Sequence, residues 1–225
     1  MRILIACAKQ WFFESEKTAE FLGLDTVWVS NPKELNEQLL NGLEPRFIFF
    51  PHWNWKVSKE VYENYLCVVF HIAPLPFGRG GSPIQNLILR GFKEAPLNAL
   101  IMDADLDAGD ILLREVISLD GKLSEILSRA AVVIQKQIVQ ITKEDLNPMP
   151  QSGKFTTFRR LSDEDNQICL ENMTLAKVYD HIRMLDAPDY PKAFLEAAGF
   201  RLEFSDAVMS ETSIDAKVKI SKRNT

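Results

Sequence analysis

Short apolar runs alternate with stretches of helical periodicity in the amino-terminal part of the chain, and this alternation limits the possible folds more than any other feature. The apolar runs predict strands at residues 2–6, 26–29, 47–50 and 68–71. The patterns between and after them predict helices at residues 14–22, 32–40, 57–65 and 82–90. Asn31 and Pro32 suit the start of the second helix, as cap and first-turn residue. A strand and helix repeat of this kind is typical of a mainly parallel sheet with helices on both faces.

The rest of the chain predicts two more strands, a long helix and a small lobe. Strands are expected at residues 97–102 and 111–117, joined by the polar loop DADLDAGD. An apolar stripe predicts a helix over residues 123–143, which Asn147-Pro148 ends. Beyond Pro150 the composition is polar, before a helix at residues 175–185 and a hairpin of residues 201–209 with 217–221. We therefore expect a Rossmann-like α/β domain over residues 1–149 and a small C-terminal α+β lobe over residues 150–225.

Composition excludes several classes of function. The net charge is -5 with a pI near 5.3, and the basic residues are scattered, so nucleic acid is not the expected partner. Three cysteines without metal-type spacing predict reduced thiols in a cytoplasmic protein and no metal site. We expect no membrane association, because no apolar run is long enough to span a bilayer. The chain also lacks the glycine-rich loops of dinucleotide and P-loop sites.

Two segments carry the chemistry, FHIAPLPFGRGGSPIQ at residues 70–85 and LDAGDIL at residues 106–112. His71 ends an expected central strand, at the sheet edge where open parallel sheets bind ligands. Asp107 lies in a loop that leads into another strand, so the two side chains are expected to meet at that edge. An aspartate beside an imidazole orients it for proton transfer. Taken singly, a strand-end histidine is more often a satisfied polar residue, and LDAGD alone is also a turn sequence.

Together these motifs resemble the folate-dependent formyltransferase family, which includes methionyl-tRNA formyltransferase, glycinamide ribonucleotide transformylase and the sugar N-formyltransferases. The resemblance rests on the histidine, leucine-proline, arginine-glycine and proline of the first motif and on the Leu-Asp-x-Gly-Asp loop. It implies that His71 and Asp107 are catalytic. The family's asparagine, two residues before the histidine, is replaced by Val69. Loss of an oxyanion donor commonly costs about a hundredfold in turnover. His52, Asn54 and Asn86 are the candidate substitutes.

The resemblance also implies 10-formyltetrahydrofolate as the formyl donor. Its pterin is expected between the segment PHWNWKV and the loop after the fifth strand, and the implied binding residues are Trp55, Val57, Ala104, Asp105 and Leu106. The alternative for the tryptophans of this segment is simple packing. The residues that we expect to bind the acceptor are Lys9, Trp11, Arg79, Gly80, Asn86 and Arg159. The alternative for Arg79 is a structural role in its loop. The alternative for Arg159, which is followed by Arg160, is a solvated face, since paired arginines usually form one.

The segments FGRGGSPIQNLI, HWNW and IRMLDAPDYPKAF resemble the sugar-formylating branch, closest to the pseudaminic acid pathway. We therefore expect the acceptor to be the primary amine of a nucleotide-linked amino sugar, such as a UDP-linked 4-amino-4,6-dideoxy sugar, in surface polysaccharide biosynthesis. The branch also implies a homodimer. The absence of a full tRNA-binding barrel after Gln151 argues against tRNA. Alternatives are formylation of another small amine, glycinamide ribonucleotide transformylation, and a non-catalytic module that binds folate or a nucleotide sugar.

Overall fold

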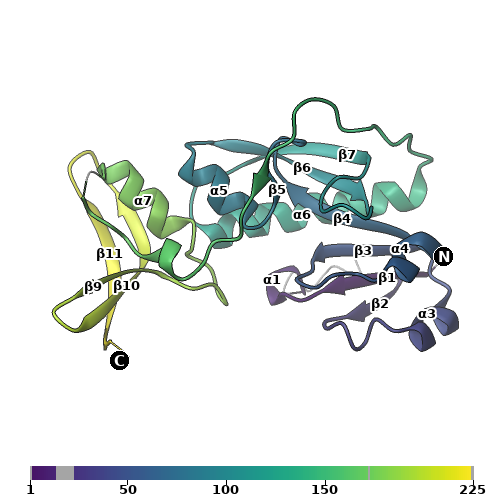
Figure 1. The fold of residues 1–225 in the computed structure, drawn as a ribbon, viewed down its shortest axis with the longest axis horizontal. Coiled ribbons are helices and arrows are strands. Elements are labelled where there is room, and N and C mark those ends of the chain that lie inside the picture. Colours follow the sequence, from purple (N-terminus) through teal and green to yellow (C-terminus); the bar gives the residue numbers. More distant parts are fainter. Residues whose placement is uncertain (1, 14–22, 172, 224–225) are drawn as a thin grey trace. The chain divides into compact units, whose positions relative to one another are not determined.

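A computed structural model describes residues 2–13, 23–171 and 173–223 (Figure 1). Contacts between residues divide the chain into two compact units. The first unit comprises Met1–Arg79, Ala95–Ile117 and Leu127–Thr157, and the second comprises Gly80–Glu94, Ser118–Ile126 and Phe158–Thr225. Both units draw on segments from each side of residue 150. The expected division of the chain into residues 1–149 and 150–225 stays a prediction.

A six-stranded sheet in the order β2-β1-β3-β4-β6-β7 forms the centre of the first unit. Its strands are β1 (Arg2–Cys7), β2 (Asp25–Val29), β3 (Phe47–His52), β4 (Leu66–Ile72), β6 (Glu94–Ile101) and β7 (Ile111–Ser118). The pairs β1 with β2, β1 with β3 and β3 with β4 are parallel, while β4 and β6 are antiparallel. The predicted α/β fold with a mainly parallel sheet is confirmed. The apolar runs of β1 and β3 are almost entirely buried, as expected of strands inside the sheet.

Helices of the first unit are α1 (Gln10–Phe13), α3 (Glu37–Leu43), α4 (Lys59–Asn64) and most of α6 (Leu123–Lys143). Leu40 of α3 and Val61 of α4 pack in one cluster with alternate residues of β1 and β3, such as Leu4 and Ile48. This cluster therefore lies between one face of the sheet and these two helices. The bounds of α6 are those predicted, and its apolar stripe is buried.

The second helix begins later than predicted. Asn36, not Asn31, caps α3: its side chain accepts a hydrogen bond of 3.0 Å from the backbone nitrogen of Leu39. Asn31 instead forms a local turn, because its side-chain oxygen accepts a bond of 3.1 Å from the nitrogen of Lys33. The helix predicted at residues 14–22 lies outside the described residues.

The second unit contains α5 (Pro83–Leu89), the short helix η1 (Glu164–Asn166), α7 (Leu175–Arg183) and a three-stranded antiparallel sheet. The sheet has the order β11-β10-β9, with β9 (Ala193–Ala197), β10 (Phe200–Met209) and β11 (Ile214–Lys222). The predicted hairpin is therefore present, and β9 extends it. A separate pair of two-residue strands, β5 (Arg79–Gly80) and β8 (Thr157–Phe158), forms the remaining sheet.

Candidate active site

His71 lies near the carboxyl end of β4, and its ring nitrogens have two different partners. Nε2 lies 2.8 Å from the carbonyl oxygen of Gly78, and Nδ1 lies 3.3 Å from Oδ2 of Asp107. The His71 and Asp107 side chains are only 6% and 8% exposed. The structure thus brings these two residues together. It does so although β6 runs antiparallel to β4, so that the carboxyl end of β6 lies beside Val68 and not beside the carboxyl end of β4.

Both partners of the imidazole are hydrogen-bond acceptors. The Gly78 carbonyl accepts only, and so does an ionised Asp107 carboxylate. Nε2 therefore carries the proton that it shares with Gly78, and the ring donates to both partners only as an imidazolium. This arrangement holds the ring from two sides and places it beside a buried carboxylate, which is a suitable setting for proton transfer.

Asp107 is held in a conformation that a non-glycine residue rarely adopts. Its φ is +52°, in the left-handed region. Two residues later, a Cβ added at Gly109 would lie 1.8 Å from the carbonyl oxygen of Ile101, so only glycine fits there. The backbone nitrogen of Ile101 donates to the carbonyl oxygen of Asp110 at 2.9 Å. The loop of residues 103–110 therefore presents Asp107 through close backbone contact with the end of β6.

Gln151 connects the two motif loops, and sequence reasoning missed it. Its Nε2 donates to the carbonyl oxygens of Asp107 and Gly109 at 2.8 and 2.9 Å, while its Oε1 accepts from Arg79. A glutamine in a polar segment has no local pattern that reveals such a role. It is the fold that brings the segment to the site, through the bridge of Met149 to Ile111 at the start of β7.

Asn98 supports the backbone around His71 and was also missed. It is fully buried on β6, opposite His71, and its Nδ2 donates to the carbonyl oxygens of His71 and Ala73 at 3.0 and 2.8 Å. Its Oδ1 accepts from Nε of Arg114 at 2.8 Å. The signal in the sequence was a polar residue inside an expected buried strand, since such groups persist only when they are hydrogen-bonded.

Val69 occupies the position of the family's asparagine and packs against apolar neighbours. It contacts the clusters that contain Phe50 and Leu100, its partners on β3 and β6. Among the candidate substitutes, Asn86 uses its Nδ2 on the carbonyl oxygens of Gly81, Ser82 and Arg159. His52 lies edge-on to the ring of Trp11, with ring centroids 5.9 Å apart.

The residues expected to bind the folate differ in exposure. Val57 is buried in the core cluster, whereas Trp55 is 43% exposed and stands edge-on to Trp53 at 4.9 Å. Ala104, Asp105 and Leu106 are exposed, with Leu106 at 70%. Trp55 and Leu106 are thus apolar side chains of the first unit that present surface to a ligand. Their role in binding stays a prediction.

The residues expected to bind the acceptor are engaged within their own units. In the first unit, Lys9 lies between β1 and α1, and Trp11 lies in α1 with its ring against His52. The Arg79 guanidinium bonds Gln151 and lies 5.4 Å from the ring centroid of Phe155. Arg79 therefore has the loop-structuring contacts considered as its alternative role.

In the second unit, Gly80 has a φ of +100°, and Asn86 is bonded as described above. Arg159 forms a two-pronged ion pair with Asp165, including a bond of 2.6 Å from Nη1. This pair lowers the pKa of Asp165 well below its usual range. The acceptor-binding roles of these residues stay predictions.

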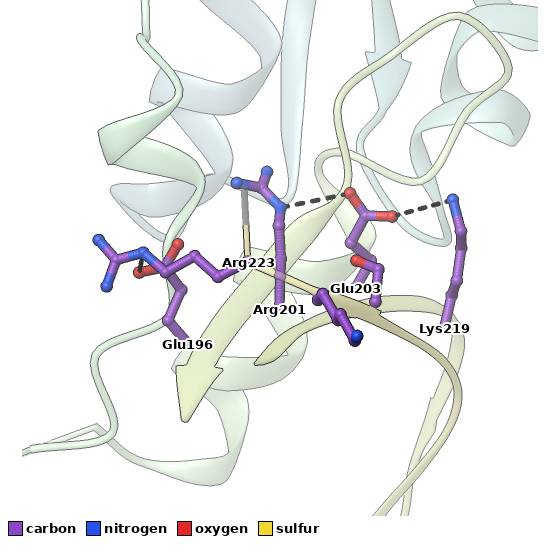
Figure 2. A pocket seen from close by; sticks show the side chains of 7 residues that line it. Glu196, Arg201, Glu203, Lys219 and Arg223 are labelled. Atoms are coloured by element: carbon purple, nitrogen blue, oxygen red, sulfur yellow. Dashed lines mark ion pairs between the residues drawn. The ribbon is translucent and has the colours of Figure 1, made fainter. Parts of the chain in front are cut away.

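Charged side chains line a hollow on the C-terminal sheet of the second unit. Figure 2 shows Arg201 and Lys219 on either side of Glu203, and Arg223 beside Glu196. The nitrogen to oxygen distances are 3.4 Å for Arg201, 3.6 Å for Lys219 and 3.1 Å for Arg223. Lys222 also lines the hollow, so four cations face two carboxylates and the surface is net positive.

Neither a metal centre nor a membrane span is found in the part of the chain that the structure describes. Across residues 2–13, 23–171 and 173–223, no three histidine, cysteine, aspartate or glutamate side chains gather in a way that could bind a metal ion. Across the same residues, no helix combines the length and apolar character needed to cross a bilayer.

Comparison with known proteins gives consistent similarities. Residues 163–221 match the family model described as "Methionyl-tRNA formyltransferase, C-terminal domain". The methionyl-tRNA formyltransferase of Bacillus mycoides is 30% identical over 190 residues, which cover 80% of this chain and 60% of that protein. The chain thus spans about 60% of the length of this curated relative.

Among solved structures, the methionyl-tRNA formyltransferase from Clostridium thermocellum superposes with a TM-score of 0.95 at 39% identity, covering 99% of this chain and 100% of that one. HypX from Aquifex aeolicus in complex with tetrahydrofolic acid gives a TM-score of 0.73 at 18% identity, covering 92% of this chain and 38% of that one. The likeness to HypX shows the fold alone.

These similarities contradict the predicted acceptor. The relatives at 30% to 39% identity are methionyl-tRNA formyltransferases, whereas the structures named as 4-N or sugar N-formyltransferases share only 14% and 16% identity. The nucleotide-linked amino sugar and the exclusion of nucleic acid are therefore wrong, and neither the pseudaminic acid pathway nor polysaccharide biosynthesis is supported. The shared folate motifs misled the assignment, because they report on the donor side. The expected homodimer stays a prediction.

Proposed function

Because the chain belongs to the methionyl-tRNA formyltransferase family, we propose that it transfers the formyl group of 10-formyltetrahydrofolate to the amino group of methionyl-tRNA. The observation that carries the proposal is the buried pair of His71 and Asp107 at the end of β4. The chain spans about 60% of the length of the curated relative from Bacillus mycoides, so the activity of that whole protein is a proposal for this chain.

Membership of the formyltransferase family confirms the enzyme class expected from the sequence. The predicted donor, 10-formyltetrahydrofolate, is the formyl donor of this family. HypX, solved with tetrahydrofolic acid, shares the fold.

The reaction forms one carbon–nitrogen bond and breaks another. The unprotonated amine of the acceptor attacks the formyl carbon, and the formyl oxygen takes up negative charge in a tetrahedral intermediate. The intermediate then expels the folate nitrogen, which gains a proton, while the acceptor amine loses one. Stabilising the oxygen and moving this proton are the two tasks for protein groups.

His71 can perform both tasks when one of its bonds is exchanged. Its Nε2 donates to the Gly78 carbonyl at 2.8 Å, so the ring reaches the formyl oxygen by exchanging that acceptor for the developing oxyanion. Asp107 keeps Nδ1 oriented during the exchange and stabilises the positive charge on the ring. Because the pair is buried, this electrostatic interaction acts in a region of low dielectric constant.

Exposed apolar side chains of the first unit suit the planar pterin of the donor. Trp55 offers a ring edge-on to Trp53, and Leu106 is largely exposed beside the aspartate loop. Aromatic and aliphatic surfaces of this kind favour a flat heterocycle over water. Residues 104–106 are exposed beside these side chains.

The charged hollow of the second unit suits the phosphates of the acceptor. It lies within the segment that matches the family's C-terminal domain, apart from Lys222 and Arg223 at its end. Lysine and arginine bind nucleic acid mainly by neutralising phosphates, and a net acidic protein does this with a local basic surface.

The test is formylation of methionyl-tRNA by the purified protein with 10-formyltetrahydrofolate, compared with the variants His71→Ala and Asp107→Asn. We expect N-formylmethionyl-tRNA from the wild type and a loss of at least about a hundredfold in kcat/KM for both variants, because each removes one half of the pair. Asp145→Asn is the matched control, as this carboxylate is exposed in the same unit. Absence of formylated tRNA with the wild type would overturn the proposal.

A further inference from the structure

We propose that residues 149–156, named here the strap, position His71 and Asp107 from both sides, with Gln151 and Thr156 as its positioning residues. The proposal deepens the proposed function and rests on it. The strap follows α6 in the first unit and bridges to β7 through Met149, whose backbone nitrogen and oxygen bond Ile111 at 2.9 and 2.8 Å.

Gln151 clamps the loop that presents Asp107. Its Nε2 donates to the carbonyl oxygens of Asp107 and Gly109, at 2.8 and 2.9 Å. Its Oε1 accepts from Nη2 and Nε of Arg79, at 2.8 and 3.1 Å. Because the planar guanidinium can only donate, it fixes which end of the amide faces the loop. All the hydrogen-bonding groups of this amide are therefore in use.

The aspartate loop needs such a clamp, because its backbone is not held by regular structure. Asp107 has a positive φ, a conformation that is unfavourable for a non-glycine residue. Without Gln151, the carbonyl oxygens of Asp107 and Gly109 would lose these hydrogen bonds and would have to bind water instead. Paired to Gln151, the two carbonyls fix the direction in which the Asp107 side chain leaves the backbone.

Thr156 clamps the partner on the other side of the imidazole. The backbone nitrogen of Gly78 donates to Oγ1 of Thr156 at 2.9 Å and to its carbonyl oxygen at 3.2 Å. The nitrogen of Thr156 donates to the Pro76 oxygen at 3.2 Å. These bonds fix the peptide at Gly78, and its carbonyl oxygen is the group that accepts from His71 Nε2.

The two clamps converge on one ring. Asp107 holds Nδ1 and Gly78 holds Nε2, while Gln151 holds the first of these residues and Thr156 the second. Residues 152–155 between the clamps are exposed, so core packing does not fix the strap there. The hydrogen bonds of Gln151 and Thr156 are thus the contacts through which the strap determines the orientation of the His71 imidazole.

The test observes the ring directly and needs no substrate. The chain has three histidines, His52, His71 and His181, so long-range proton–nitrogen spectra of the histidine rings are simple to assign with His71→Ala. We expect Gln151→Met and Thr156→Val to shift the His71 nitrogen signals. Gln140→Met should leave them unchanged, since it removes an amide that bonds the exposed Glu144, just after α6.

Kinetics with methionyl-tRNA provide the second readout. We expect kcat to fall about 10- to 100-fold in Gln151→Met with KM for both substrates nearly unchanged, because small displacements of catalytic groups cost about this much. Thr156→Ser retains the hydroxyl and should recover both the signals and the kcat that Thr156→Val loses.

Gln151→Glu separates positioning from a loss of folding. It keeps an acceptor for Arg79 but replaces the donors to Asp107 and Gly109 with a carboxylate oxygen, so the His71 signals should shift while the thermal midpoint stays close to wild type. Unchanged His71 signals in Gln151→Met, Gln151→Glu and Thr156→Val would overturn the strap proposal. That result is independent of whether methionyl-tRNA is the acceptor, because the spectra come from the free protein.

Discussion

Gly109 sets the path of the loop that carries Asp107. An alanine methyl group would meet the Ile101 oxygen at 1.8 Å, so Gly109→Ala must displace the loop or the end of β6. A displacement of about 1 Å at a catalytic group costs about a hundredfold in rate, and we expect a loss of this size in kcat. Steady-state formylation assays measure it.

The matched control for this substitution is Gly42→Ala. Gly42 lies inside α3, and among the described residues no atom beyond the helix's own backbone and its chain neighbours lies within 4 Å of a Cβ added there. Alanine there should raise the free energy of unfolding by about 0.5–1 kcal/mol, because glycine is the weaker helix former, and should leave kcat unchanged. Equal activity of the two variants would show that the loop tolerates a shift and that Asp107 does not need its present position.

At the scale of single residues, some residues of the site could be predicted from the sequence and others could not. His71 and Asp107 were predicted as neighbours from the rule that strand ends of a parallel sheet meet at one edge. They do meet, but β6 runs antiparallel to β4, so the path of the loop after β6, and not the rule, brings Asp107 to His71. Gln151 could not be predicted, because its partners are two backbone carbonyls in a distant loop, and every residue type has such a carbonyl. Asn98 was visible as a polar residue in an apolar strand, but its partners are also carbonyls.

At the scale of elements, Asp206 joins the C-terminal hairpin to the segment before α6. It lies at the irregularity of β10 and pairs with Lys122 at 2.7 Å and Lys217 at 3.0 Å. The hydrogen bond from Lys122, followed by that from Lys217, lowers the pKa of Asp206 from 3.8 to about 2. A carboxylate with a lowered folded-state pKa stabilises the fold above its unfolded pKa, and this stabilisation is lost as the pH falls through the folded value.

We therefore expect Asp206→Asn to unfold at a lower temperature than wild type at pH 7. The difference should narrow below about pH 4, become small near pH 2 and vanish only below it, because Asp206 in the folded protein is half protonated at about pH 2. Asparagine also tolerates the positive φ of this position. Thermal unfolding followed by circular dichroism at a series of pH values measures the difference.

Asp215→Asn on β11 is the control for this titration. The carboxylate is exposed, and within the described residues it forms no ion pair, so its variant should match wild type throughout the pH series. A wild-type advantage over Asp206→Asn that persists unchanged at pH 2 would mean that shape, and not the ion pairs, accounts for the contribution of Asp206.

Elements with a long periodic pattern were predicted best. The bounds of α6 agree at both ends, because its buried stripe repeats over many turns and an Asn-Pro pair follows it. β9 was missed, since the sequence AFLEA is short and has helical propensity. Pairing with β10 overrides that propensity, and such tertiary contacts are not visible in a local pattern.

At the scale of the molecule, the net charge of -5 conceals a local basic surface, so the net charge alone could not exclude nucleic acid. The cations of the hollow differ in how strongly ion pairs within the protein hold them. Arg201 is bound to both Asp163 and Glu203, and Lys219 is 79% exposed with a loose pair at 3.6 Å. Within the part of the chain that the structure describes, Lys222 forms no ion pair. Lys219 and Lys222 are thus the cations most available to phosphates.

We expect Lys219→Ala and Lys222→Ala to raise KM for methionyl-tRNA and to leave KM for the folate unchanged. Each phosphate contact that is lost should lower the slope of log affinity against log salt concentration by about 1, because fewer counterions are then released on binding. Filter binding of tRNA at several salt concentrations measures this slope. Lys33→Ala, at an exposed lysine of the first unit, should keep the wild-type slope. If the Lys219 and Lys222 variants also keep it, the acceptor's phosphates bind elsewhere on the chain, and the hollow is held by its ion pairs for stability alone.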